Sequence, residues 1–107
     1  MARVDYSDEA LSDLEQIGDY IADELQNPQA VLHTVTMIQD RIDKLADFPF
    51  IGAPLSSIVD VDTDYRFLVC GSYLAFYRPV ENLVLIDRVL YGRRDYLAIL
   101  FGDISEE

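Results

Sequence analysis

RFLVCGSYLAFYRPVENLVLIDRVLYGRRD, residues 66–95, is the stretch of sequence that decides the fold. It contains three runs rich in Val, Leu, Ile, Phe and Tyr, a composition typical of strands. Gly71-Ser72 and the segment 79–82 separate these runs and are turn signals. We therefore expect a meander of strands over 66–70, 73–78 and 83–90.

An amphipathic helix is predicted near the N-terminus. Ser7 is a favoured N-cap residue, and Asp8 and Glu9 follow in the first turn, where the helix dipole favours anions. The apolar residues at spacings of three and four are Leu11, Leu14, Ile17, Ile21 and Leu25. The acidic residues expected on the opposite, solvated side are Asp13, Glu15, Asp19, Asp23 and Glu24. Gly18 either costs about 1 kcal/mol relative to alanine or permits close packing.

A second helix should start at Asn27-Pro28, with Asn as N-cap and Pro at the first helical position, and run to about Phe48. Its apolar stripe is Val31, Val35, Ile38, Ile42 and Leu45. Residues 2–6 are predicted to form a short strand. Because neither helix can bury its stripe alone, the strands must supply the packing surface. The expected fold is α+β: an N-terminal strand and a two-helix hairpin packed on a small, mainly antiparallel sheet, in one domain over residues 1–107.

The charge of the chain is unevenly distributed. The formal net charge is -12, yet residues 66–94 hold five arginines against only Glu81 and Asp87. These arginines predict a local cationic surface that binds a carboxylate or a phosphate. The alternative for Arg78 and Arg88 is pairing with the acidic helices of the same chain. The acidic remainder should repel nucleic acid at long range, so a protein partner is easier to reconcile with this balance.

Few groups point to catalysis or metal binding. The sequence has no CxxC, HExxH, P-loop or GxSxG motif. His33 is the only histidine and is expected to be structural, and Cys70 is expected in the core. The alternating Asp60, Asp62 and Asp64 are expected to form a solvated loop rather than a cation site. We expect no metal site and no cofactor.

A single cysteine fits a reducing cytosol, and no apolar run approaches the roughly 20 residues of a membrane span. The N-terminal residues also lack the apolar stretch of a signal peptide. These observations predict a cytoplasmic protein without a membrane partner.

The segments GSYLAFYRP (71–79) and RVLYGRRDY (88–96) follow a helical hairpin that ends near Pro49-Phe50-Ile51-Gly52. Together they resemble the RelE/ParE superfamily, the toxins of bacterial type II toxin–antitoxin systems, over nearly the whole chain. The resemblance implies a compact toxin held inactive by a cognate antitoxin, whose extended or helical segment wraps it. RelE-like members cut mRNA in the ribosomal A site, whereas ParE-like members are reported to poison DNA gyrase.

The resemblance favours the ParE-like branch. RelE-like nucleases carry basic residues on the strand before the GSY turn, an arginine just after the turn's tyrosine, and a C-terminal tyrosine. Matched by position, this chain has Tyr65, Phe67, Leu74 and Leu100, and only Arg94 fits the nuclease pattern. Each missing oriented donor should remove about 3 kcal/mol of transition-state stabilisation.

The resemblance therefore implies a toxin that binds a protein target, DNA gyrase. One alternative is a ribosome-dependent mRNA endonuclease that uses Arg94, Arg66 and Tyr96, and another is a degenerate toxin that only binds its antitoxin. Tyrosine and arginine together are a common interface composition. The residues expected to contact the target or the antitoxin are Arg66, Tyr73, Tyr77, Arg78, Arg88, Leu90, Arg93, Arg94 and Tyr96.

Overall fold

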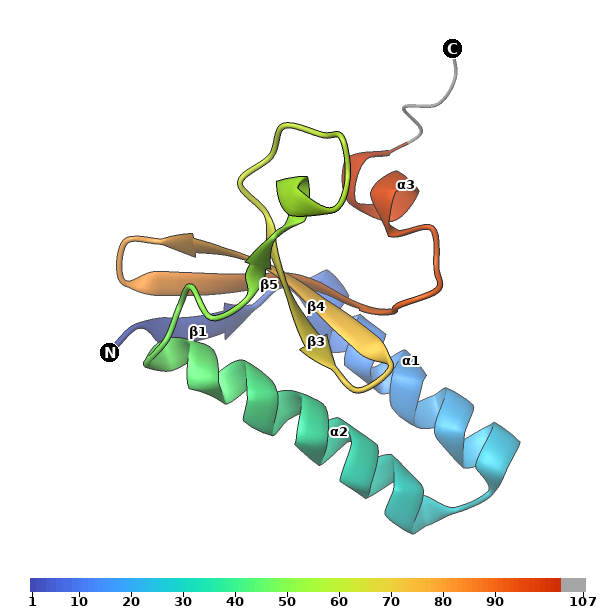
Figure 1. Cartoon of the computed structure of the whole chain (residues 1–107). Coiled ribbons are helices and arrows are strands. Elements are labelled where there is room, and N and C mark those ends of the chain that lie inside the picture. The colour runs from blue at the N-terminus through green and yellow to red at the C-terminus, as the bar shows by residue number, and fades with distance from the viewer. Residues whose placement is uncertain (103–107) are drawn as a thin grey trace.

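A computed structural model describes residues 1–102 of the chain (Figure 1). Its elements, in order, are β1 (Arg3–Tyr6), α1 (Asp8–Leu25), α2 (Pro28–Asp43), a 3-10 turn (Lys44–Ala46), β2 (Ala53–Pro54), a second 3-10 turn (Leu55–Ser57), β3 (Arg66–Cys70), β4 (Tyr73–Val80), β5 (Leu83–Tyr91) and α3 (Tyr96–Phe101). The predicted α+β class is confirmed. The short strand β2 and the helix α3 were not predicted.

The strands form one five-stranded sheet in the order β1-β5-β4-β3-β2. The meander β3–β4–β5 is antiparallel as expected, and β1 joins its edge in parallel with β5. Strand β4 continues through Pro79 and Val80, two residues that were expected in the turn. The turn is therefore confined to Glu81 and Asn82, and Glu81 takes a left-handed φ of 56°.

Local hydrogen bonds start both helices at the predicted residues. The Ser7 side chain accepts a hydrogen bond from the Ala10 backbone N–H at 2.9 Å. The Asn27 side chain accepts from the N–H groups of Gln29 and Ala30 at 3.1 and 3.3 Å. Each cap satisfies backbone donors that the first helical turn leaves without a partner.

The buried face of α1 differs from the predicted stripe. Leu11 and Leu25 are exposed, and Ala10 and Asp13 are buried in their place. The expectation that Asp13 lies on the solvated side is therefore wrong. The helix meets the sheet along a line only slightly rotated from the predicted one, and this rotation brings residue 13 to the interface while residues 11 and 25 turn away.

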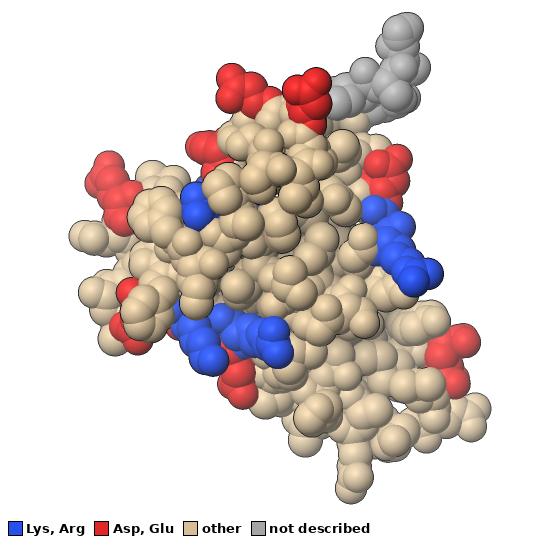
Figure 2. Space-filling model, in the orientation of Figure 1, with Lys and Arg blue, Asp and Glu red and all other residues tan. Residues whose placement is uncertain are grey.

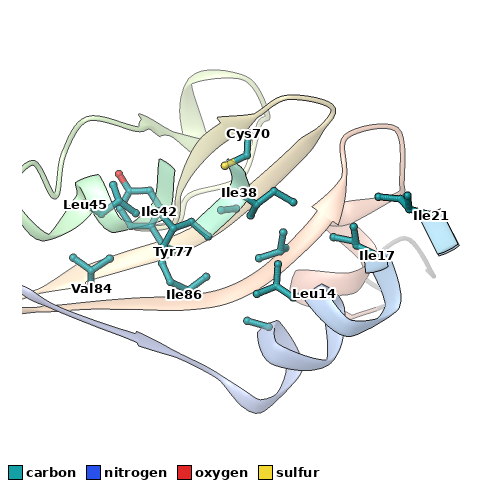
Figure 3. Packing of buried hydrophobic residues seen from close by; sticks show 13 residues of the cluster. Leu14, Ile17, Ile21, Ile38, Ile42, Leu45, Cys70, Tyr77, Val84 and Ile86 are labelled. Atoms are coloured by element: carbon teal, nitrogen blue, oxygen red, sulfur yellow. The ribbon is translucent and has the colours of Figure 1, made fainter. Parts of the chain in front are cut away.

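Two hydrophobic clusters lie on opposite faces of the sheet. In the first, α1 and α2 cover one face, and Leu14, Ile17, Ile38 and Ile42 meet side chains of the strands (Figure 3). Val35 is only half buried and lies outside this cluster. The second cluster is built on Leu55, Phe76 and Leu90, with partly buried residues of α3 and of the segment between β2 and β3 around them. Figure 1 shows α3 on the side of the sheet opposite to α1 and α2.

Gly18 lies where α1 approaches α2. A Cβ atom at this position would stand 3.4 Å from Cγ1 of Val31, which is an ordinary van der Waals contact, so the packing of the two helices does not require glycine here. Within residues 1–102, no helix combines the length and the apolar character needed to cross a membrane.

Candidate functional site

The arginines of the C-terminal half do not form one cationic surface. Figure 2 shows basic side chains at separate places on the visible face rather than in one continuous patch. Arg78 Nε lies 3.2 Å from Asp87 Oδ2, a charge contact without hydrogen-bond geometry. Arg66 donates to the carbonyl oxygens of Phe50 and Gly52 at 3.1 and 2.6 Å, and its guanidinium lies 5.1 Å from the centre of the Phe50 ring.

Arg88 is paired with α1 inside the fold. Its Nε and Nη2 donate to the two carboxylate oxygens of Asp13, each at 2.8 Å. Asp13 also accepts a hydrogen bond from the Val89 backbone N–H at 2.9 Å. Three charge-assisted bonds offset the desolvation of this carboxylate, whose side chain is 5% exposed. The hydrogen bond to Asp13 raises the pKa of Arg88. Arg66, Arg78 and Arg88 therefore do not form the expected cationic surface. Arg88 pairs with helix α1, as the alternative expected, whereas Arg78 lies against Asp87 of strand β5 rather than against an acidic helix.

A β-bulge makes this pairing possible. Phe76 pairs with Arg88 and Tyr77 pairs with Ile86, which leaves Asp87 as an extra residue in β5. A bulge redirects neighbouring side chains relative to strict alternation. Here it directs Arg88 to α1 and Asp87 to Arg78 on the adjacent strand.

A pocket of about 510 Å³ lies between α1, the start of β4 and the end of β5. We call it the tyrosine pocket, and its lining residues are Asp13, Gln16, Ile17, Tyr20, Tyr73, Val89, Leu90, Tyr91 and Arg94. Helix α1 supplies one wall, the paired strands supply the other, and the chain that leaves β5 brings Arg94 to the pocket.

The chemistry of the tyrosine pocket is apolar with polar groups at its margin. The rings of Tyr73 and Tyr91 meet edge to face with centroids 5.9 Å apart. Burial, followed by the proximity of Tyr20 and Tyr91, raises the pKa of Tyr73, so its hydroxyl remains a hydrogen-bond donor. Asp13 is already compensated by Arg88. Arg94 is exposed and has no ion pair within residues 1–102, so it is the one uncompensated charge on the lining.

The structure brings together only some of the predicted contact residues. Tyr73, Leu90 and Arg94 line the tyrosine pocket. Arg93 is exposed beside Arg94. Tyr96 begins α3 and packs on Phe76 with ring centroids 5.1 Å apart, away from the pocket lining.

Tyr77 and Leu90 do not offer a free surface to a partner. Tyr77 is fully buried, and its hydroxyl accepts from the Gly52 N–H at 3.0 Å and donates to the Pro49 carbonyl at 2.9 Å. The expected partner contact is therefore wrong for Tyr77, which holds the loop before β2 against the sheet. Leu90 is 2% exposed and packs in the second hydrophobic cluster, although it is also among the residues that line the tyrosine pocket.

Residues of α1 were missed as candidates for the site. Asp13, Gln16, Ile17 and Tyr20 recur at spacings of three and four, so they share one face of the helix. The sequence feature that could have identified this face is the acidic residue Asp13, which lies among the apolar residues Ala10, Leu14 and Ile17 on the helix. An acid inside an apolar stripe is expected to be paired.

Four positions matched above to the nuclease pattern lie on the other face of the sheet. Tyr65, Phe67, Leu74 and Leu100 are all partly buried members of the second hydrophobic cluster. The ring of Tyr65 meets that of Phe101 from α3 edge to face at 5.6 Å. In this chain, apolar packing beneath α3 occupies that region.

Two residues considered for catalysis occupy unremarkable positions. His33 is exposed on α2, and Cys70 is buried in the first cluster as predicted. Burial raises the pKa of the Cys70 thiol to about 11, which disfavours the nucleophilic thiolate. Among the described residues, no three His, Cys, Asp or Glu side chains could together hold a metal ion.

Comparison with known proteins connects this architecture to a family. Residues 4–96 match the profile described as the ParE toxin of type II toxin–antitoxin systems. A solved structure titled as the chromosomal ParDE toxin–antitoxin system from P. aeruginosa superposes with a TM-score of 0.72 at 22% identity, covering 85% of this chain and 96% of that chain. YafQ from E. coli strain BL21(DE3) gives a TM-score of 0.51 at 15% identity, covering 95% of this chain and 100% of its own. No curated protein matches the sequence. At these identities the two structures establish similarity of fold.

Proposed function

This chain belongs to the ParE family of type II toxin–antitoxin toxins, and from that membership we propose that it arrests growth by binding DNA gyrase until a cognate antitoxin neutralises it. Residues 1–107 would act as one toxin domain in the cytoplasm, where gyrase and the antitoxin are found.

The packing beneath α3 is the observation that supports binding rather than RNA cleavage. In-line cleavage needs a group that activates the 2′-hydroxyl and cations that stabilise the phosphorane. Tyr65, Phe67, Leu74 and Leu100 stand at the corresponding positions and pack in the second hydrophobic cluster. Arg94 is the one residue that fits the nuclease pattern. Because each oriented donor contributes about 3 kcal/mol, the missing donors would reduce transition-state stabilisation by several kcal/mol.

The charge distribution supports a protein target. Arg66, Arg78 and Arg88 are engaged with groups of the chain itself, so they are not available to follow a phosphate backbone. The chain as a whole carries a net charge of -12, which opposes docking into an RNA-rich surface. Arg93 and Arg94, on the exposed segment after β5, are the basic residues best placed to meet a partner's carboxylates.

Two assays on the purified chain separate gyrase poisoning from RNA cleavage. We expect inhibition of gyrase supercoiling, or accumulation of cleaved gyrase–DNA complexes, and no codon-phased cleavage of mRNA in a translating extract. A-site cleavage that disappears with Arg94→Ala would overturn the gyrase assignment and support the endonuclease alternative. Antitoxin binding without either activity would identify a degenerate toxin.

A further inference from the structure

The tyrosine pocket is large enough to receive an anchoring side chain of a partner. Its volume of about 510 Å³ lies within the range of pockets that enclose small ligands, roughly 300–1,000 Å³. Aromatic and aliphatic side chains form most of the lining, and buried anchors in such pockets dominate the affinity of protein interfaces. Because Tyr20 is 62% exposed, a partner that fills the pocket would also cover this ring.

The charges around the pocket define what can enter. Arg88 donates hydrogen bonds from Nε and Nη2 to the two carboxylate oxygens of Asp13. A partner's carboxylate would have to displace Asp13 to bind these two nitrogens. Arg94 is the remaining charge on the lining. A partner's carboxylate at the mouth of the tyrosine pocket would therefore bind Arg94. The Tyr73 hydroxyl, on the same lining, is a neutral hydrogen-bond donor.

The outer surface of α1 restricts the rest of the partner. Its exposed acids include Glu9, Glu15, Asp19, Asp23 and Glu24. Glu24 lies four residues after Tyr20 on the same helical face, one turn beyond the pocket. A segment that is acidic throughout would be repelled here. A segment with one acid at Arg94 and a neutral or basic residue near Glu24 would be accepted.

We propose that the tyrosine pocket receives a bulky apolar side chain of the antitoxin that is directly adjacent to an Asp or Glu, whose carboxylate binds Arg94. This inference rests on the proposed function, because the occupant is the neutralising antitoxin. It adds the chemistry of the recognised segment: an apolar anchor, a neighbouring acid, and a neutral or basic residue where the segment passes Glu24.

The first test measures binding of the protein encoded by the reading frame adjoining this one. Tyr20→Ala should weaken binding at least about tenfold, because the anchor loses one wall of its pocket. Arg94→Gln should weaken it about three- to tenfold at low salt and less at high salt. Leu32→Ala is the matched control, since Leu32 is 70% exposed on α2 and lies outside the pocket. Circular dichroism should show that all three variants remain folded.

A second test needs no antitoxin. N-acetyl-phenylalanyl-aspartate amide should shift the backbone NMR signals of Gln16, Tyr20, Tyr91 and Arg94. The wild type should bind the matching asparagine dipeptide at least about threefold more weakly than the aspartate dipeptide. The Arg94→Gln variant should bind the two dipeptides with equal affinity.

The outcomes distinguish the two proposals. If the antitoxin binds and neither Tyr20→Ala nor Arg94→Gln alters its affinity, the pocket inference is wrong while neutralisation stands. If the wild-type chain does not bind the adjoining protein, the proposed function fails, and the dipeptide titration alone decides the chemistry of the pocket. Absence of shifts at these four residues would overturn the pocket inference.

Discussion

The two faces of the sheet are built differently. On the face covered by α1 and α2, 13 buried residues form one cluster, most of them aliphatic. On the face covered by α3, the cluster contains three buried residues among those the structure describes, and the partly buried side chains around them include several aromatic rings. Helix α3 itself has six residues and none of them is fully buried. The difference indicates that the first face supports the global stability of the fold, whereas α3 adds a smaller, local contribution.

The largest expected effect tests the first face. Ile38→Ala should lower the free energy of unfolding by about 2–4 kcal/mol, because Ile38 is fully buried and its truncation leaves a cavity. Urea denaturation measures this loss. Leu32→Ala on the same helix is the control and should change stability by less than about 0.5 kcal/mol. A similarly small loss for Ile38→Ala would show that the buried face of α2 has been assigned incorrectly.

The next effect concerns the connection between α1 and β5. Asp13→Ala should destabilise the fold by about 2–3 kcal/mol, because it leaves Arg88 and the Val89 N–H without their acceptor. Asp19→Ala, at an exposed acid of the same helix, should be near neutral. Replacing both partners, Asp13→Leu with Arg88→Met, should recover much of the loss. If Asp13→Ala behaves like Asp19→Ala, the ion pair does not connect these elements.

A smaller effect is expected on the second face. Phe101→Ala removes the contact with Tyr65 and should reduce global stability by only about 1 kcal/mol. Hydrogen exchange should show the amides of residues 96–101 opening before those of α1 in the wild type, and still faster in the variant. A loss equal to that of Ile38→Ala would show that α3 is as integral to the fold as α2.

The last effect is a pH dependence within the first face, which is absent at neutral pH. Burial raises the pKa of Cys70 from 9.0 to about 11. As the pH rises through this interval, the unfolded chain loses the thiol proton while the native state retains it, so the free energy of unfolding should fall. Cys70→Ala should make the decrease between these pH values shallower. Tyr6 and Tyr65, with pKa values of about 12, also lower the stability at high pH, but they are present in both proteins. If the free energy of unfolding falls with pH at the same slope in both proteins, the thiol does not contribute.

Most of the elements were predictable because local interactions determine them. Ser7 and Asn27 cap the helices at the expected positions, and the alternation and turn signals of residues 66–91 correctly placed the meander. Helix α3 was not predicted. Its residues, YLAILF, form a short apolar run whose helical state cannot be separated from a strand by periodicity alone.

The candidate site was predictable only in part. Tyr73, Leu90 and Arg94 were selected by composition, and all three line the tyrosine pocket. Gln16 and Tyr20 line the same pocket but belong to a helix about 50 or more residues earlier in the sequence, so local patterns did not connect them with it. Tyr77 had the same composition signal as Tyr73, and the two differ only in burial. Strand alternation places both on the face covered by α1 and α2, and the position along the strand decides which one is covered completely.

The sequence by itself determined the helices, the strand meander, the strong acidity and the family to which the chain belongs. Only the tertiary structure decided which arginines remain available to a partner. Asp13 and Arg88 are 75 residues apart, and their pairing depends on the packing of α1 against β5 and on the bulge, where Asp87 has no register partner in β4. The physical reason is range: capping and alternation act between residues a few positions apart, whereas charge pairing and burial depend on the distances created when the whole chain packs.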